Sequence, residues 1–597
     1  MLLAISAALA TFRISLPPSS PSALGRVRLY FSTRCGPADS APRAQCSDNQ
    51  DTSQVFGVDA DLAPGGAVEI NSTVLGYPRR SLSELSGAYC VQAELFRFEV
   101  YRRGDGVNLT LPSSCVSDGG GDGAYGSPPG TLYSDVVNLT LPSAAEVKLS
   151  LSHEVAPVAS PGCSGVGNDT EWIKTVRVDS ALLKKFWGKS MRLEACVLLP
   201  YGFHDHPTAK YPLLVAHGHY SATFNPGGRF DPTPPAAGMT GYDLVDQLYA
   251  NYFYNNWTSA DGPFQGARAL VITVNHPVPF FDDSYAVDSA NVGPYGTAIM
   301  RELIPAVEAR YRGIGEGWAR GVLGGSTGGW EAFAAQVLYP DDFNYAAVAC
   351  PDPIAFTSYT TVDLYEDKNA YYYDSPFKKT ARPGYRDHYS GTAVVPGTST
   401  VTYGSPKGQT TATVQEMNLR EVVLGPRSGS CGQWDIWEAV FGPRGADGYP
   451  ARVWCKDPTK GCEYGAINTT VAHYWRDHFD LLGVLRREWR AGLGAKLAGK
   501  LHVFVGGGDS FFLTNAVMDF QDWVTSPEVQ PPFEGEIVVG THGGRGYEHC
   551  FNGYLPDGTV APNGITRELY VQKFLPRMAA RWAATAPPGA SMEWHEY

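Results

Sequence analysis

The chain has 597 residues, and its 60 acidic residues outnumber 47 basic ones, which gives a formal net charge of −13. That length allows two or more domains and a large buried core. The acidic balance argues against a nucleic-acid partner, because binding to phosphates requires clustered Lys and Arg. No apolar run reaches the ~18 residues that a bilayer span requires, so we expect no membrane-spanning segment.

The beginning of the chain and its cysteines indicate the compartment. Residues 1–10 (MLLAISAALA) are small and apolar but lack a positive start, so they fit either a signal remnant or a clipped or misplaced start codon. The 11 cysteines include no CxxC pair, and the close pairs Cys35/Cys46 and Cys455/Cys462 suit short disulfides within loops. Six N-x-S/T sequons accompany them, at Asn71, Asn108, Asn138, Asn168, Asn256 and Asn468. We therefore expect a disulfide-bonded glycoprotein that is secreted or resides in the lumen of the secretory pathway.

Residues 11–155 predict an all-β domain, most simply a sandwich. Short alternating or β-branched runs recur between clusters of Gly, Pro, Ser and Asp, at residues 12–16, 27–31, 68–70, 89–100 and 147–151. The aromatic residues of this part either form its core or line a carbohydrate-binding face, and the core is the favoured interpretation; examples are Phe56, Tyr77, Tyr89 and Phe96. Residues 156–171, rich in Pro, Ser and Gly, predict a linker.

After the linker, residues 172–597 predict an α/β domain with a mostly parallel sheet. Apolar strand-like runs alternate with helical patterns, at residues 193–199, 212–216, 269–274, 321–323, 345–349, 501–505 and 536–539. One helical pattern spans residues 300–311, where Pro305 predicts a bend or a restart, and another spans residues 571–582. Residues 352–500, with few regular signals before residues 471–489, form a long insertion. Such an insertion leaves the carboxyl edge of the sheet and commonly covers the active site.

Residues 320–330 (RGVLGGSTGGW) carry the strongest functional signal. They contain G-x-S-x-G from Gly324 to Gly328, with an apolar strand before it and a helical pattern after it. Glycines at the flanking positions let the strand reverse directly into the helix and leave the serine hydroxyl strained and exposed. The helix N-terminus then stabilises negative charge that develops beside the serine. We predict that Ser326 is a nucleophile; a surface turn in a glycine-rich chain is the alternative.

A serine nucleophile requires a base and an orienting carboxylate, in the chain order Ser, acid, His. Asp509 follows an apolar strand and three glycines and is the preferred acid, whereas Asp352 lies in a rigid turn between two prolines and is the alternative. After the last strand, His542 lies nearest the sheet, and His549 follows a glycine-rich loop that is long enough to reach the nucleophile. We favour His549 as the base and keep His542 as the alternative.

The oxyanion of an acyl-transfer reaction requires N–H donors. The strand at residues 212–216 runs into the loop at residues 217–220, so the backbone N–H groups of His219 and Thr327 are the predicted pair. His217 and His219 also form an H-x-H pair of the kind that binds metals, as do His204 and His206. Their spacing does not impose a closed site with a carboxylate, and we expect neither a metal nor a cofactor.

The chain resembles the esterase branch of the α/β-hydrolase superfamily, which includes esterase D, feruloyl esterases and mycolyltransferases. The matching segments are residues 211–219, 295–312 (with R-E-L-I-P), 325–329, 339–343 (Y-P-D-D-F), 508–509 and 548–549. The likeness covers roughly residues 176–582. Within the family, we suspect a subgroup of long secreted members with an N-terminal β module, whose marks here are residues 433–435, 447–450 and 548–553. The resemblance implies Ser326, Asp509 and His549 as the triad. In compact members, however, the histidine follows the last strand closely, which is nearer the place of His542.

These observations predict a serine carboxylic-ester hydrolase that works through an acyl-enzyme intermediate. Its substrate would be a small-molecule or carbohydrate-linked ester. The alternatives are an acyltransferase or a peptidase on the same fold, or a non-catalytic binding protein with a vestigial site. The peptidases usually carry a propeller before the hydrolase, and residues 11–155 are too few for one at ~40–45 residues per blade.

Overall fold

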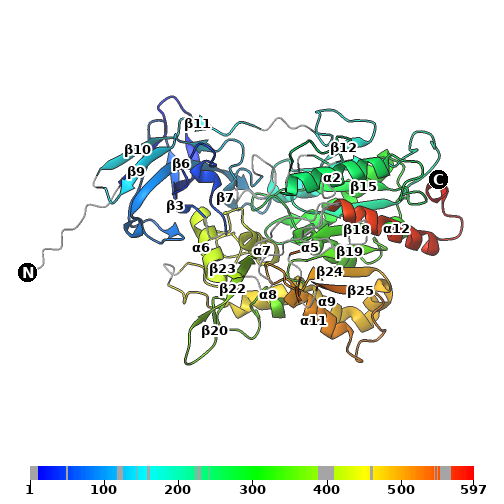
Figure 1. Ribbon diagram of the computed structural model, residues 1–597. Helices are drawn as coiled ribbons and strands as arrows, with labels where there is room; N and C mark the ends of the chain where they lie inside the picture. Colours follow the sequence, from blue (N-terminus) through cyan, green and yellow to red (C-terminus); the bar gives the residue numbers. More distant parts are fainter. Residues whose placement is uncertain are drawn as a thin grey trace, which may run out of the picture.

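The computed structural model describes residues 11–48, 52–116, 126–143, 145–157, 162–221, 223–224, 230–239, 241–387, 409–457, 461–542, 545–546, 549–550 and 567–597. Residues 1–10, where the signal remnant is expected, lie outside this set. In Figure 1 the N-terminal strands occupy one side of the molecule, a sheet flanked by helices occupies the other, and residues from 350 to 500 fill much of the space between and below them. No helix within the described ranges combines the length and the apolar character that a membrane crossing requires.

A nine-stranded sheet forms the centre of the C-terminal part, in the order β12-β13-β15-β14-β18-β19-β24-β25-β26. The strands are β12 (Ile173–Asp179), β13 (Arg192–Leu198), β14 (Leu213–His217), β15 (Leu270–Asn275), β18 (Arg320–Gly325), β19 (Ala346–Ala349), β24 (Leu501–Gly506), β25 (Glu536–His542) and β26 (Arg545–Gly546). The strands from β15 to β25 in this order run parallel to one another, whereas β13 is antiparallel to both β12 and β15, and β26 is antiparallel to β25. The expected mostly parallel sheet is confirmed.

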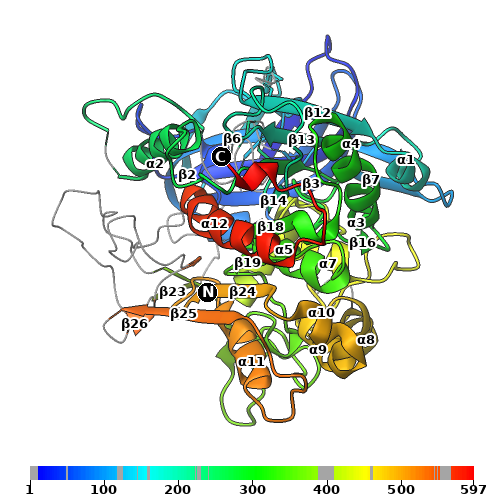
Figure 2. The same ribbon diagram turned by 90° about the vertical axis from the view of Figure 1, so that its right-hand side faces the viewer.

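Helices cover both faces of this sheet. Figure 2 shows α2 (Gly241–Trp257) and α12 (Arg567–Thr585) on one side, and α3 (Tyr295–Ala298), α4 (Ile304–Arg310) and α5 (Thr327–Leu338) on the other. Helices on both faces explain why the central strands are continuously apolar: every residue of β15 is buried. The parallel strands therefore end at one common edge, where their loops meet.

The helical pattern around Pro305 is interrupted as predicted. A π-helical turn, η3 (Ile299–Leu303), separates α3 from α4, and α4 begins at Ile304 with Pro305 in its first turn. Proline is tolerated in a first turn because its missing N–H has no helical acceptor there. The restart thus follows from the chemistry of proline.

The N-terminal strands form two further sheets with a core of their own. One is β10 (Glu146–Ser150), β1 (Thr11–Ser15) and β4 (Ala67–Ile70), and the other contains β2 (Ala23–Ser32), β3 (Gln54–Leu62) and the long β6 (Gly87–Arg102). Their apolar side chains meet between the sheets, where the rings of Phe12 and Phe31 lie 5.2 Å apart. Phe56 belongs to this core and Tyr89 packs against it, as the core interpretation expects. Phe96 is buried in a separate cluster with Cys115 and Cys431, and Tyr77 is buried against residues of the insertion.

The insertion between β19 and β24 contains more regular structure than its sequence pattern indicates. Besides α8 (Thr469–His478) and α9 (Leu481–Glu488), it holds α6 (Val414–Leu424) and α7 (Gln433–Phe441). The few regular signals in the sequence before residues 471–489 therefore do not reveal these two helices. From Trp434 onward every residue of α7 is buried, so this helix shows no polar face that a periodicity could reveal.

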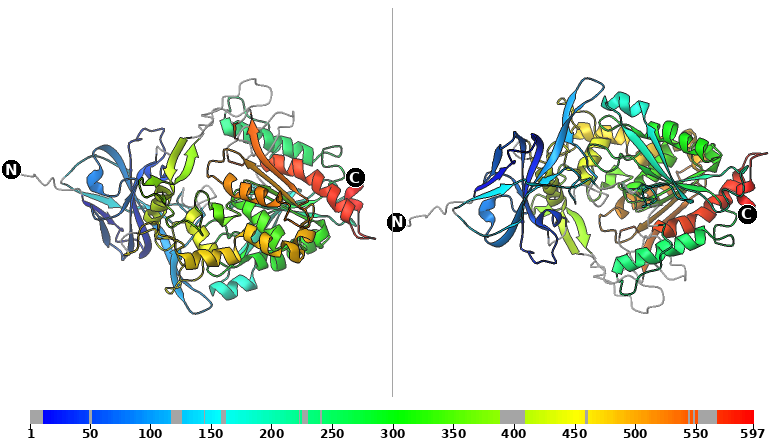
Figure 3. Two further views of the ribbon diagram at one scale, coloured as in Figure 1. Left: turned by 90° about the horizontal axis from the view of Figure 1, so that it is seen from below. Right: turned by 90° about the horizontal axis from the view of Figure 1, so that it is seen from above.

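The insertion is attached firmly to the N-terminal strands. Helix α6 lies beside β3 in Figure 1, and the side chains of Arg26 and Arg28 donate hydrogen bonds to the carbonyls of Val423 and Leu424 at its end, at 3.0 and 2.9 Å. Guanidinium groups satisfy these last carbonyls, which have no partner within the helix. A disulfide between Cys115 and Cys431 adds a covalent link. Figure 3 shows from above and below how the insertion fills the space between the two sheet regions.

The cysteines form five disulfides, and one thiol is free. Cys455 pairs with Cys462 as expected, but Cys35 pairs with Cys90 and not with Cys46, which is buried and free. Proximity in sequence fails here because β2 and β6 are neighbouring strands, which brings Cys35 and Cys90 together. The other bonds join Cys115 to Cys431, Cys163 to Cys196 and Cys350 to Cys550.

Candidate active site

Ser326 lies in a sharp turn between β18 and α5. Its backbone has φ 57° and ψ −122°, a left-handed conformation that side chains rarely adopt. A Cβ atom at Gly324 would lie 2.1 Å from the carbonyl oxygen of Gly328, and one at Gly328 would lie 2.3 Å from that of His217. Only glycine fits at either position, so the G-x-S-x-G spacing follows from steric limits. The turn presents the Ser326 hydroxyl above the helix N-terminus.

Three side chains from distant loops form a hydrogen-bonded chain at this turn. His549 Nε2 lies 3.1 Å from Ser326 Oγ, and His549 Nδ1 lies 2.7 Å from Asp509 Oδ2. Asp509 is fully buried at the end of β24, and its Oδ1 accepts hydrogen bonds from the N–H groups of Phe511 and Leu513. The carboxylate is therefore held rigidly toward the imidazole. This is the order of contacts that a nucleophile, a base and an orienting acid require.

The electrostatics of His549 suit a base. Burial lowers the pKa of its imidazole, but the charge and the hydrogen bond of Asp509 raise it more, so the pKa lies above the ordinary value of 6.5. Asp352 adds to the upward shift, and His219 opposes it. The carboxylate that raises the pKa of the imidazole also makes His549 a stronger base, as the removal of the Ser326 proton requires.

The structure also places the two alternative residues. Asp352 makes no hydrogen bond to His549; its Oδ2 instead accepts from Thr327 Oγ1 at 3.1 Å and from Trp437 Nε1 at 3.2 Å. His542 is the last residue of β25, and its side chain is outside the described set. Among the described side chains, Asp509 and His549 are thus the ones that continue the chain of contacts from Ser326.

Of the two predicted oxyanion donors, Thr327 follows Ser326 in the chain and His219 lines the same cavity as Ser326. Thr327 is the first residue of α5, where backbone N–H groups have no helical acceptor. His219 follows β14, and its ring contacts the buried Asp282, with 3.1 Å between Nδ1 and Oδ1. Strands β14 and β18 are parallel neighbours, with Leu213 paired to Arg320 at one end and His217 paired to Gly324 at the other. Both strands therefore end at the same edge of the sheet. The loops after these strands therefore meet at the nucleophile.

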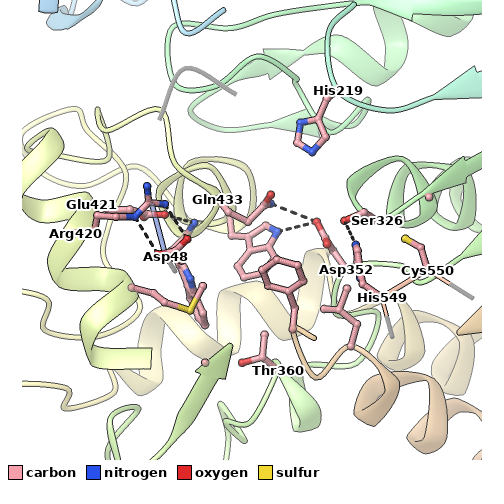
Figure 4. A pocket seen from close by; sticks show the side chains of 17 residues that line it. Asp48, His219, Ser326, Asp352, Thr360, Arg420, Glu421, Gln433, His549 and Cys550 are labelled. Atoms are coloured by element: carbon pink, nitrogen blue, oxygen red, sulfur yellow. Dashed lines mark hydrogen bonds and ion pairs between the residues drawn. The ribbon is translucent and has the colours of Figure 1, made fainter. Parts of the chain in front are cut away.

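A cavity of about 460 Å³ opens at Ser326. Ser326, His549 and Cys550 lie at one end in Figure 4, and Asp48, Arg420 and Glu421 lie at the other. The wall between them is largely apolar and comes from Met417, Trp434, Trp437, Phe511 and Leu513. Asp48 belongs to the N-terminal region and Arg420 to the insertion, and the two form a buried ion pair at 3.0 Å. All three parts of the chain therefore shape this cavity.

Asp352 is the centre of a polar network inside the cavity that the sequence does not reveal. Tyr285, Gln433 and Trp437 all donate hydrogen bonds to its Oδ2, and Tyr285 also contacts Thr327. Burial raises the pKa of Asp352, and the hydrogen bonds from Tyr285 and Trp437 oppose that shift. No spacing in the sequence connects these donors; the unusual positive φ of Tyr285 is visible only in the structure.

No protein-family profile matches this chain, and no curated protein does. Solved structures that resemble it include a ferulic acid esterase (13% identity, TM-score 0.33), with 68% of this chain and 98% of the other covered. A substrate-bound, fluorophosphonate-binding serine hydrolase of Staphylococcus aureus is 12% identical with a TM-score of 0.31. The match covers 68% of this chain and 98% of the other. An S-formylglutathione hydrolase of Agrobacterium tumefaciens is 9% identical with a TM-score of 0.30, and the match covers 70% of this chain and 99% of the other. At these values, the likeness does not assign an activity to this chain.

Proposed function

We propose that the protein is a serine carboxylic-ester hydrolase that acts through an acyl-enzyme intermediate. The observation that carries this proposal is the chain of contacts from Ser326 through His549 to Asp509, with distances of 3.1 and 2.7 Å, at a strained strand-to-helix turn. The order of the sheet and the cavity at Ser326 support it further. Together they provide a nucleophile, a base and space for a substrate.

In the first half of the reaction, Ser326 Oγ attacks the ester carbonyl while His549 Nε2 takes the hydroxyl proton. The N–H groups of His219 and Thr327 stabilise the negative oxygen of the tetrahedral intermediate. When the intermediate collapses, His549 returns the proton to the departing alcohol. In the second half, His549 activates water, which attacks the acyl-enzyme and releases the acid, and Ser326 regains its proton. Asp509 holds the imidazole throughout.

The cavity indicates the kind of ester that would bind. Its walls are apolar around Trp434 and Trp437, whereas carboxyl and guanidinium groups occupy the end away from Ser326. A cavity of about 460 Å³ is typical of small-molecule sites. The substrate would therefore be a small ester, free or linked to a carbohydrate, with an apolar body.

The five disulfides are typical of proteins that mature in an oxidising compartment. On this ground we infer that the chain is secreted or resides in the lumen of the secretory pathway. The chain would then fold there as two domains, residues 11–155 and residues 172–597. The disulfide between Cys115 and Cys431 joins the first domain to the insertion of the second.

The decisive test compares variants with a fluorophosphonate probe and with short p-nitrophenyl esters. Wild type should be labelled and Ser326→Ala should not, and turnover should fall by about 10⁵–10⁶-fold in the variant. His549→Gln should lose activity to a similar extent, whereas the matched His542→Gln variant should keep it. Equal labelling of wild type and Ser326→Ala, or a folded wild type without any ester turnover, would overturn the proposal; the latter would favour a binding protein.

A further inference from the structure

Asp352 presents one carboxylate oxygen to the substrate cavity, while the rest of its side chain is enclosed. The residue is only 3% exposed, yet it belongs to the lining of the cavity in Figure 4. Donor groups converge on its Oδ2 atom, from Tyr285, Thr327, Gln433 and Trp437. The other oxygen, Oδ1, has no hydrogen-bond partner among the described residues, and it is not one of their completely enclosed atoms. A substrate group that displaces water from Oδ1 must donate in its place, because an unpaired buried carboxylate oxygen is costly.

The charge of Asp352 has no counter-ion in direct contact among the described side chains. The donors around Oδ2 favour the ionised form of the carboxyl group. The basic side chains of the cavity lining already face other carboxylates, in the pairs Arg420–Asp48, His219–Asp282 and His549–Asp509, at 3.0, 3.1 and 2.7 Å. A buried carboxylate is costly unless a cation pairs with it. The cavity beside Asp352 leaves room for a substrate to supply that cation.

Two indole rings stand beside this carboxylate. Trp434 and Trp437 both lie on α7 and line the cavity, and their ring centroids are 5.1 Å apart. Nε1 of Trp437 is 3.2 Å from Oδ2 of Asp352, so this ring adjoins the charged group directly. Indole attracts a positive charge through its π electrons more strongly than the other aromatic side chains do. A carboxylate oxygen with tryptophans around it is therefore a combination that recognises an organic ammonium group.

We propose that the cavity takes esters that carry a protonated amine, and that Asp352 is the residue that binds the ammonium group. This inference rests on the proposed function, because it names the class of ester that the same site would hydrolyse. The backbone N–H of Asp352 donates to the carbonyl of Ser326 at 3.3 Å, which fixes the carboxylate beside the turn of the nucleophile. An ammonium group at Oδ1 would thus lie near the ester bond. A protonated amine suits this oxygen better than a quaternary ammonium group, because it donates a charge-assisted hydrogen bond.

The first test measures binding without catalysis. Calorimetry on the Ser326→Ala variant near neutral pH compares benzylammonium with benzyl alcohol, a neutral molecule of nearly the same shape. We expect benzylammonium to bind at least about 10-fold more tightly, because only the cation pairs with the carboxylate. Adding Asp352→Asn to this variant should abolish the preference. Adding Glu366→Gln instead, which removes an exposed carboxylate that does not line the cavity, should leave it unchanged.

The second test follows the reaction of the wild type. The kcat/KM for methyl 4-(aminomethyl)benzoate should exceed that for methyl 4-ethylbenzoate, its neutral isostere, by about 10-fold or more. Asp352→Asn should remove this difference by raising KM for the cationic ester. Benzylammonium should also slow the fluorophosphonate labelling of Ser326 in the wild type, and benzyl alcohol should do so much less. The labelling experiment locates the ammonium group in the cavity even where Asp352→Asn fails to fold.

Equal binding of benzylammonium and benzyl alcohol to Ser326→Ala would overturn the proposal, and so would a preference that survives in a folded Asp352→Asn variant. Strong benzylammonium binding that leaves the labelling of Ser326 unchanged would place the cation elsewhere and would overturn it as well. A wild type that hydrolyses neutral esters but has no preference for the cation would contradict this inference alone. A folded wild type that binds benzylammonium but hydrolyses no ester would contradict the proposed function instead.

Discussion

Cys350 and Cys550 form a disulfide that touches both the nucleophile and the base. Cys350 comes directly after β19, and its sulfur lies 3.3 Å from the backbone nitrogen of Ser326. Cys550 is the residue after His549. The bond thus ties the loop of the base to the turn of the nucleophile, although the two cysteines are 200 residues apart in sequence.

We expect the double variant Cys350→Ala/Cys550→Ala to fold but to lose about 10- to 100-fold in kcat/KM, because small displacements of a catalytic group are costly. The matched control is Cys455→Ala/Cys462→Ala, which removes a surface bridge between residues 7 apart. Ester hydrolysis and circular dichroism of both variants would check this. Equal activities would show that the bond does not position His549.

The pH profile should report the raised pKa of His549. A base must be neutral to accept a proton, so kcat/KM should fall as the pH drops through a pKa that lies above 6.5. Removing the charge with Asp509→Asn should move this acidic limb to lower pH and reduce kcat by about 10³–10⁴-fold. The groups that also act on the imidazole, Asp352 and His219, remain in this variant. An unchanged limb in Asp509→Asn would contradict the assignment of the acid.

Asp352 should affect substrate binding more than proton transfer. Replacement by Asn removes the charge that organises the donors of Tyr285, Gln433 and Trp437 in the cavity. We expect KM to rise and kcat to fall by no more than about 10-fold, because His549 keeps Asp509. Steady-state kinetics of Asp352→Asn and Asp509→Asn side by side would decide. A larger kcat loss in Asp352→Asn would make Asp352 the orienting acid.

The six sequons should not be glycosylated equally. Asn108, Asn138, Asn168 and Asn468 are exposed, whereas Nδ2 of Asn256, the atom that would carry a glycan, is buried. We expect glycans at the four exposed sites and none at Asn256 when the chain is expressed through a secretory pathway. Enzymatic deglycosylation in ¹⁸O-water followed by peptide mass spectrometry measures this. Full occupancy of Asn256 would require a different local structure.

The ion pair between Asp48 and Arg420 should stabilise the contact between the N-terminal strands and the insertion. Nε and Nη2 of Arg420 each lie 3.0 Å from one oxygen of Asp48, and both side chains are buried. Asp48→Asn should destabilise the protein by about 3–5 kcal/mol, because it removes the negative charge that faces the buried Arg420. Glu69→Gln, which breaks the exposed pair with Arg13, should cost less than about 1 kcal/mol. Thermal unfolding of both variants would test the difference.

The sequence alone predicts the features that depend on neighbouring residues. The strand-to-helix turn at Ser326 follows from Gly324 and Gly328, the restart of α4 follows from Pro305, and the parallel sheet follows from alternating apolar runs. Each is a local consequence of sterics or periodicity. Helix α7 escapes this logic because burial on nearly all sides removes the polar face that a pattern requires. Helix α6 escapes it because polar residues, Asn418, Arg420 and Glu421, are buried among its apolar ones.

The tertiary structure alone decides which distant groups meet. It brings His549 to Ser326 across 223 residues and to Asp509 across 40, pairs Cys35 with Cys90 where the sequence suggests Cys46, and surrounds Asp352 with its donors. The physical reason is that such contacts depend on the order in which strands assemble into a sheet. That order minimises the free energy of the whole chain and is not encoded in any one segment.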